Sequence, residues 1–246
     1  EAGGKVLDTR VLVGDQAAPY SGFAAGFGHG LSRASLQGAP HFKDFEFIGQ
    51  FPIATINFKD KAFPGRVSLS AFNPFIPMNE KDSSLPGAFF TIELTNTSGQ
   101  PIDYTVAGTL KNPHANNSVN QFFQSGACRG IKLGNPFQDP AKTEYKDMNL
   151  ATDAADVSYQ EYWFRGNWFD NYGIYWQDLC RPGKLRNRAY PAPTQAGPAT
   201  LDDHATLAAH VRLAPGEARA VRFVITWNCP LMDNYWDQPF IQQQNG

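Results

Sequence analysis

Residues 63–96 constrain the fold most, because they combine two strand patterns with a loop that is fixed by proline. Polar and apolar side chains alternate over residues 66–71 and again over residues 88–95, which predicts two strands that are each buried on one face. The chain between them contains three prolines, Pro74, Pro77 and Pro86. Because each proline removes a backbone donor and fixes one φ angle, we predict a shaped loop here rather than a central strand or a long helix.

Strand patterns continue on both sides of this segment. Residues 5–13 predict an opening strand, and residues 43–60 predict two strand pieces that meet near Pro52. Since proline cannot donate to a β-ladder, Pro52 marks a bulge or a sheet edge. Residues 102–107 alternate again after a short turn. Consecutive strands joined by short turns favour an antiparallel meander or a Greek key.

A second clear pattern lies near the end of the chain. Apolar and more polar side chains alternate over residues 206–213 and again over residues 221–226. Pro215 and Gly216 stand between them, in the central positions that a type II turn prefers. We therefore predict a β-hairpin. Weaker patterns in the middle of the chain predict short strands at residues 121–123 and 129–133.

The composition fits one large all-β domain that spans residues 1–246. The chain is 42% apolar, which is enough to bury a full core. Its 22 glycines and 18 prolines are expected where many strands are joined by many turns.

The charge balance excludes several classes of partner. Charged residues make up 18% of the chain and the net charge is -2, so the sequence predicts no binding to nucleic acid or to an anionic membrane surface. No apolar run reaches the roughly 18 residues that a transmembrane segment needs. Because the chain opens at Glu1, a signal peptide or an upstream segment could have been removed, and the compartment stays open between cytoplasmic and exported.

The three cysteines, Cys128, Cys180 and Cys229, lie far apart in the sequence and form no Cys/His cluster at zinc-ligand spacing. We expect buried thiols rather than a metal site. No metal and no cofactor are predicted.

An aromatic stretch at residues 162–176 is the main candidate for binding. It mixes tryptophans and tyrosines with planar polar side chains, a combination that suits the apolar face and the hydroxyl rim of a sugar ring. The same aromatic residues also suit a sandwich core or a domain interface, and the pattern favours that interpretation. The candidates for sugar or interface contacts are Trp163, Trp168, Asp170, Tyr175, Trp176 and Trp236.

The spacing of residues identifies no catalytic site. A glycosidase usually needs two carboxyl groups that flank the scissile bond, and no pair of acidic residues stands out here. The Gly-x-Ser-x-Gly motif is absent, and the five histidines lie near no obvious nucleophile. No catalytic residue is assigned.

Several segments carry a family resemblance. They are, in order, FPIATINF at 51–58, AFNPFIPMNEKDSSLPGAFFTIELTN at 71–96, LAPGE at 213–217, FVITWNCP at 223–230 and DNYW at 233–236. With these segments the chain resembles the N-terminal domain of glycoside hydrolase family 116, which includes non-lysosomal glucosylceramidases and bacterial β-glucosidases. The proline-bearing pieces AFNPFIP and SSLPG are the most specific parts.

The resemblance implies a two-sheet antiparallel β-sandwich of the supersandwich kind, packed against a following (α/α)6 barrel. In that family the nucleophile glutamate and the acid/base aspartate lie in the barrel, so neither has a counterpart here. It also implies a β-glucoside or a glucosylated lipid as the substrate, bound through the barrel. The family's glycine-rich opening has no clear match near Glu1.

Three hypotheses follow. The chain is the non-catalytic sandwich of a retaining β-glycosidase, or a free-standing carbohydrate-binding module that uses Trp163, Trp168 or Trp176 as platforms, or a purely structural sandwich whose aromatic patch faces the barrel.

Overall fold

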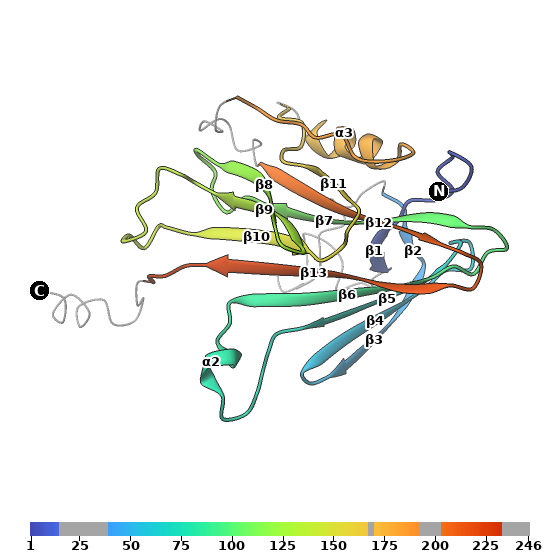
Figure 1. Cartoon of the computed structure of the whole chain (residues 1–246), viewed down its shortest axis with the longest axis horizontal. Helices are drawn as coiled ribbons and strands as arrows, with labels where there is room; N and C mark the ends of the chain where they lie inside the picture. Colours follow the sequence, from blue (N-terminus) through green and yellow to red (C-terminus); the bar gives the residue numbers. More distant parts are fainter. Residues whose placement is uncertain (15–38, 167–169, 192–202, 233–246) are drawn as a thin grey trace, which may run out of the picture.

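The computed structural model describes residues 1–14, 39–166, 170–191 and 203–232. Two antiparallel sheets face each other, and a helix covers the outer side of the smaller one (Figure 1). This arrangement confirms the all-β sandwich.

The larger sheet has eight strands, and every neighbouring pair is antiparallel. In order across the sheet they are β3 (Asp44–Gln50), β4 (Ile53–Lys59), β5 (Arg66–Phe72), β6 (Gly87–Thr95), β13 (Ala218–Asn228), β10 (Asp147–Thr152), β9 (Cys128–Gly134) and β8 (Val119–Ser125). The last strand in sequence, β13, therefore lies in the middle of the sheet, between β6 and β10.

The smaller sheet has three antiparallel strands, in the order β11 (Val157–Gln160), β12 (His204–Leu213) and β7 (Ile102–Lys111). A short parallel pair, β1 (Val11–Gly14) and β2 (His41–Phe42), lies beside the sheets. Two helices are described, α2 (Glu80–Ser83) and α3 (Asp170–Leu179).

The opening segment folds largely as its pattern predicts. Strands β3 to β6 form a meander, and Pro52 stands in the turn that leads out of the edge strand β3, which confirms its place at a sheet edge. The proline loop between β5 and β6 holds the single helical turn α2. Asn79 caps this turn, because its side-chain oxygen accepts from the Asp82 backbone N–H at 3.1 Å.

The predicted hairpin near the end of the chain is wrong. The turn itself is present: Gly216 has φ 77°, and the Glu217 N–H donates to the Ala214 carbonyl at 3.0 Å. However, β12 pairs with β11 and β7 in the small sheet, whereas β13 pairs with β6 and β10 in the large one. Alternating polarity identifies which face of a strand is buried, and two strands from opposite layers show the same alternation as a paired hairpin.

The predicted opening strand is also too long, since only Val11–Gly14 of residues 5–13 forms a strand. Asp8 interrupts the pattern: its carboxylate accepts from the Thr9 backbone N–H at 2.8 Å and from Arg10 Nε at 3.0 Å. Such local bonds compete with a ladder. The two weak predictions in the middle of the chain are confirmed as parts of β8 and β9.

The core lies between the sheets. Fully buried side chains come from both layers, including Ile131 and Leu133 of the large sheet and Leu207 and Leu213 of the small one. Among the described strands the chain passes between the two layers four times, and two of these crossings, from β6 to β7 and from β12 to β13, are neighbours at one end of the sandwich. Asn96, which is 0% exposed, stands where these two crossings meet.

The three cysteines are free, and their expected burial is wrong. Cys128 and Cys180 are partly exposed, and Cys229 is exposed. Cys128 is the first residue of β9, and Cys180 and Cys229 directly follow α3 and β13. These positions at the ends of elements lie near the surface, so the small size and apolar character of cysteine do not bury them. Within the described ranges, no helix is long and apolar enough to cross a membrane.

Candidate functional site

The aromatic stretch becomes a layer over the outer face of the small sheet. Sequence analysis predicted no helix there, but its second half forms α3, which lies across the small sheet on the side away from the large one (Figure 1). Tyr175 contacts this face through the Thr109 hydroxyl, which donates to the Tyr175 hydroxyl at 3.4 Å. Burial raises the pKa of Tyr175. The predicted aromatic cluster is thus a structural contact between helix and sheet.

Trp163 lies inside this layer and is 9% exposed. Its ring stacks on Tyr175 at a centroid distance of 4.1 Å and on His204 at 4.6 Å. The indole Nε1 donates to the Thr206 hydroxyl at 2.8 Å. The indole is therefore stacked on two rings of the same chain and largely shielded from solvent, and it also contributes to the lining of a pocket.

The other predicted residues are placed differently. Trp176 is partly buried and lines a pocket, and its ring lies 6.2 Å from that of Tyr172. Asp170 is exposed at the first residue of α3. Trp168 and Trp236 lie outside the described residues. The structure thus brings Trp163, Tyr175 and Trp176 together and leaves Asp170 at the edge of the group.

A buried ion pair beside this layer was not predicted from the sequence. Asp203 is 3% exposed and accepts from Arg165 Nε at 2.8 Å and from Arg165 Nη2 at 2.7 Å. The Ser118 hydroxyl donates to the same carboxylate at 2.5 Å. The Arg165 guanidinium also lies over the rings of Tyr162 and Tyr190, at 4.6 and 4.4 Å. The sequence contains only one sign of this ion pair, an arginine flanked by aromatic residues, because its partner Asp203 is 38 residues away.

A Ser–His contact was missed as well, and the expectation that no histidine lies near a nucleophile is wrong. His210 Nε2 lies 2.7 Å from Ser158 Oγ, on the neighbouring strand. His210 Nδ1 contacts Thr105 Oγ1 at 3.0 Å rather than a carboxylate. Ser158 Oγ also accepts from the Leu185 N–H at 3.0 Å. Burial lowers the pKa of His210, and the Ser158 side chain is covered, so this contact is structural.

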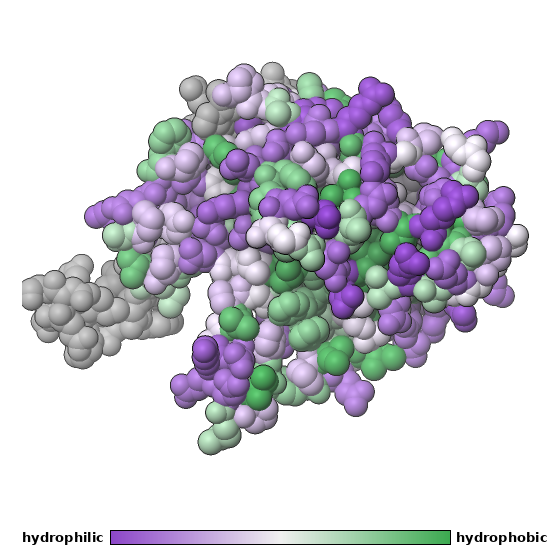
Figure 2. Space-filling model, viewed as in Figure 1, coloured by the Kyte–Doolittle hydropathy of each residue, from purple (hydrophilic) through white to green (hydrophobic). Residues whose placement is uncertain are grey.

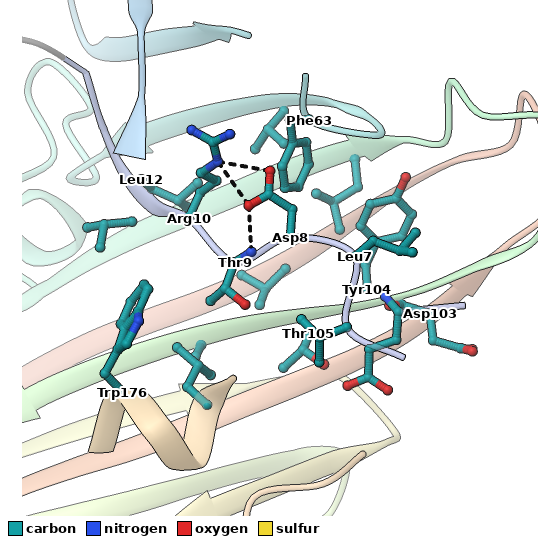
Figure 3. A pocket seen from close by; sticks show the side chains of 18 of the residues that line it. Leu7, Asp8, Thr9, Arg10, Leu12, Phe63, Asp103, Tyr104, Thr105 and Trp176 are labelled. Atoms are coloured by element: carbon teal, nitrogen blue, oxygen red, sulfur yellow. Dashed lines mark hydrogen bonds and ion pairs between the residues drawn. The ribbon is translucent and has the colours of Figure 1, made fainter. Parts of the chain in front are cut away.

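A pocket of about 420 Å³ opens at the free side of β7, between the N-terminal segment, the sheets and α3 (Figure 3). Its walls are mainly apolar, with Leu7 and Leu12 on the N-terminal side and Trp176 on α3. Tyr104 contributes a ring whose hydroxyl donates to the Pro64 carbonyl at 2.5 Å, and burial raises the pKa of this hydroxyl. Such walls suit a ligand that has an apolar face.

The charged groups around the pocket are all engaged. Asp8 pairs with Arg10 at 3.0 Å (Figure 3), and Arg10 Nη1 also reaches Asp60 at 3.2 Å. A hydrogen bond from the Ala62 N–H lowers the pKa of Asp60, and the charge of Arg10 lowers it further.

The other two carboxylates of the lining, Glu1 and Asp103, bind the Gly183 N–H and Arg212. Each carboxylate of the described lining therefore has a hydrogen-bond or ion-pair partner in this structure. Among the described residues, no group of three or more His, Cys, Asp or Glu side chains could hold a metal ion.

Solved structures share a general likeness with this chain at low similarity. A protein assigned as a kojibiose phosphorylase, from the human microbiome, has 12% identity and a TM-score of 0.42, over 83% of this chain and 22% of its own. A polysaccharide lyase has 12% identity and a TM-score of 0.39, over 72% of this chain and 22% of its own.

A galactose mutarotase related enzyme from Lactobacillus acidophilus has 9% identity and a TM-score of 0.34, over 75% of this chain and 71% of its own. The chain thus spans about a fifth of the length of the first two structures. A search of curated protein sequences finds no significant match.

One family model matches almost the whole chain. It is described as "beta-glucosidase 2, glycosyl-hydrolase family 116 N-term" and aligns with residues 9–244. The segments that carry the resemblance in the sequence, including the proline loop and the turn at 213–217, all lie within this match. The chain belongs to the N-terminal domain family of glycosyl-hydrolase family 116.

Proposed function

We propose that this chain is the non-catalytic N-terminal β-sandwich of a retaining β-glycosidase of the β-glucosidase or glucosylceramidase type. It supports, and partly shapes, the active site of a helical (α/α)6 barrel that follows it. The observation that carries the proposal is the family match over residues 9–244.

The substrate of the whole protein would then be a β-glucoside or a glucosylated lipid, bound through the barrel. The sandwich contributes rigidity, since a site held by packed sheets keeps its loops in place better than one held by loops alone.

An assay of the isolated chain on an aryl β-glucoside tests the proposal. We expect no turnover above background from the chain alone and turnover from the full-length protein. Robust turnover by the chain, abolished by a point substitution within it such as Asp8→Asn, would contradict the proposal.

A carbohydrate-binding module remains the second candidate, and the partly exposed Trp176 at the pocket is the observation that favours it. Isothermal calorimetry against glucosides and cello-oligosaccharides tests it directly. Heat that disappears in Trp176→Ala and persists in Asp170→Asn would support this function, whereas no heat at high ligand concentration would exclude it.

A further inference from the structure

Exposed apolar side chains gather at one end of the large sheet, where β4 and β6 begin and where β5 and β13 end. We call them the exit patch: Phe51, Phe75, Ile76, Met78, Leu85 and Trp227. Met78 is 102% exposed, Phe51 79% and Phe75 53%. Figure 2 shows hydrophobic residues over this region, in the lower part of the view around α2 and the β3–β4 hairpin. A group of large exposed apolar residues marks an interaction surface.

The segments that carry the exit patch are tied to one another. The Trp227 N–H donates to the Pro86 carbonyl at 3.1 Å, which joins β13 to the proline loop. The rings of Phe51 and Phe75 meet edge to face, with centroids 5.3 Å apart, which joins the β3–β4 turn to the same loop. The exit patch is therefore one continuous surface built from three segments.

The proline loop presents its apolar side chains in a fixed shape. Ser83 Oγ accepts from the Ile76 N–H at 2.9 Å and lies 3.1 Å from the Ile76 carbonyl, to which it donates. Asn79 Nδ2 donates to the Asp82 carboxylate at 2.7 Å. Three prolines restrict the remaining backbone. A preorganised loop loses little conformational entropy when a partner covers it, which favours binding.

The opposite end of the sandwich is different in character. There polar turn residues close the β6–β7 and β12–β13 crossings, and Asn96 links these two turns by hydrogen bonds. Most of the large exposed apolar side chains of the described residues thus lie at the end where β13 leaves the sheet. Strand β13 ends at Asn228, and the next described apolar residues, Leu231 and Met232, are also exposed (Figure 1).

We propose that the exit patch is the docking surface for the helical domain that follows the N-terminal domain in a family 116 protein. This inference rests on the proposed function, which supplies the partner. Phe51, Phe75 and Met78 act as anchors that enter an apolar groove between helices of that domain. The charged side chains of α2, Glu80, Lys81 and Asp82, form a polar rim beside the anchors.

Hydroxyl-radical footprinting of the full-length protein tests the proposal, because the chain offers a matched pair of phenylalanines. Phe47, on β3 outside the exit patch, is 61% exposed, and Phe75 is 53% exposed. If no partner covered either side chain, the two would therefore be modified at similar rates. We expect slow modification of Phe75 and Met78 and fast modification of Phe47. Equal rates for Phe75 and Phe47, or a protection that is lost on dilution and so comes from a second copy, would overturn the proposal.

The double variant Phe51→Ser/Phe75→Ser provides a second test of the docking surface. In the full-length protein, loss of two anchors should raise the oxidation rate of Met78 by up to about 30-fold. The control Phe47→Ser should leave that rate unchanged. Circular dichroism of both variants confirms that the sandwich remains folded.

The two proposals fail separately. Fast oxidation of Met78 in a full-length protein that still needs its helical domain for turnover would refute the docking surface and leave the proposed function standing. Turnover by the isolated chain would refute the proposed function whatever the footprint shows.

Discussion

The side-chain amide of Asn96 donates to the carbonyl of Leu213 at 3.0 Å, across 117 residues of sequence. The same amide donates to the Gln100 carbonyl at 2.8 Å, and its oxygen accepts from both the backbone and the hydroxyl of Ser98. The Asn96 carbonyl accepts from the Gly216 N–H at 2.9 Å. One buried residue therefore links the β6–β7 turn to the β12–β13 turn, two of the four described passages from one sheet to the other.

Asn96→Ala should lower the free energy of unfolding by about 3 kcal/mol, because it leaves buried carbonyls and a turn N–H without partners. Urea unfolding of the chain measures the loss. The control is Asn116→Ala, since Asn116 is exposed and its change should stay within about 0.5 kcal/mol. A loss at Asn96 no larger than that of the control would show that the crossings hold without it.

The Arg165–Asp203 pair is expected to be costly to break. Asp203→Asn should destabilise the chain by about 3–5 kcal/mol, because it removes the negative charge of a buried ion pair. Asp103→Asn is the matched control: it breaks the exposed pair with Arg212, which contributes about 0–1 kcal/mol. Similar thermal midpoints for the two variants would contradict the buried pair's role.

Trp163 is predicted to stabilise the folded chain. Trp163→Ala removes a buried indole from between two rings and should cost about 3–5 kcal/mol of unfolding free energy. Trp176→Ala, in the same layer but partly exposed, should cost clearly less. The denaturant midpoints of the two variants measure this difference in stability. An unchanged midpoint in Trp163→Ala would show that the stacked layer does not hold α3.

His210 should make stability depend on pH. Burial lowers its pKa below the usual 6.5, so the unfolded chain binds the proton more readily than the folded chain. The contribution of His210 is therefore complete above pH 6.5 and is lost as pH falls below that value toward the lowered pKa.

The variant His210→Gln should flatten the curve of unfolding free energy against pH in this window. Unfolding midpoints measured at a series of pH values test this. A wild-type curve and a variant curve of equal slope would refute the assignment to His210.

Local patterns predicted the strands well and their partners poorly. Alternation at residues 221–226 correctly predicts an inward apolar face, and Pro215–Gly216 correctly predicts the turn. Which sheet receives the strand depends on the register with β6 and β10, which lie far away in sequence and leave no local trace.

The candidate site was only partly predictable. Tyr172, Tyr175 and Leu179 recur at helical spacing, so periodicity could have identified α3. The density of aromatic residues instead predicted a core, a domain interface or a sugar-binding surface, without a helix. The covering of Trp163 by His204 and the pairing of Arg165 with Asp203 could not have been predicted, because each joins segments about 40 residues apart whose approach depends on the packed sheets.

The central place of β13 has a consequence for synthesis of the chain. Seven strands of the large sheet leave the ribosome before β13, yet they can only form two separate halves, with the free edges of β6 and β10 unpaired. The sheet becomes whole when residues 218–228 are inserted between those edges. A nascent chain that stalls before β13 thus exposes two unpaired strand edges, which favour aggregation. Insertion of β13 removes both edges as it completes the sheet.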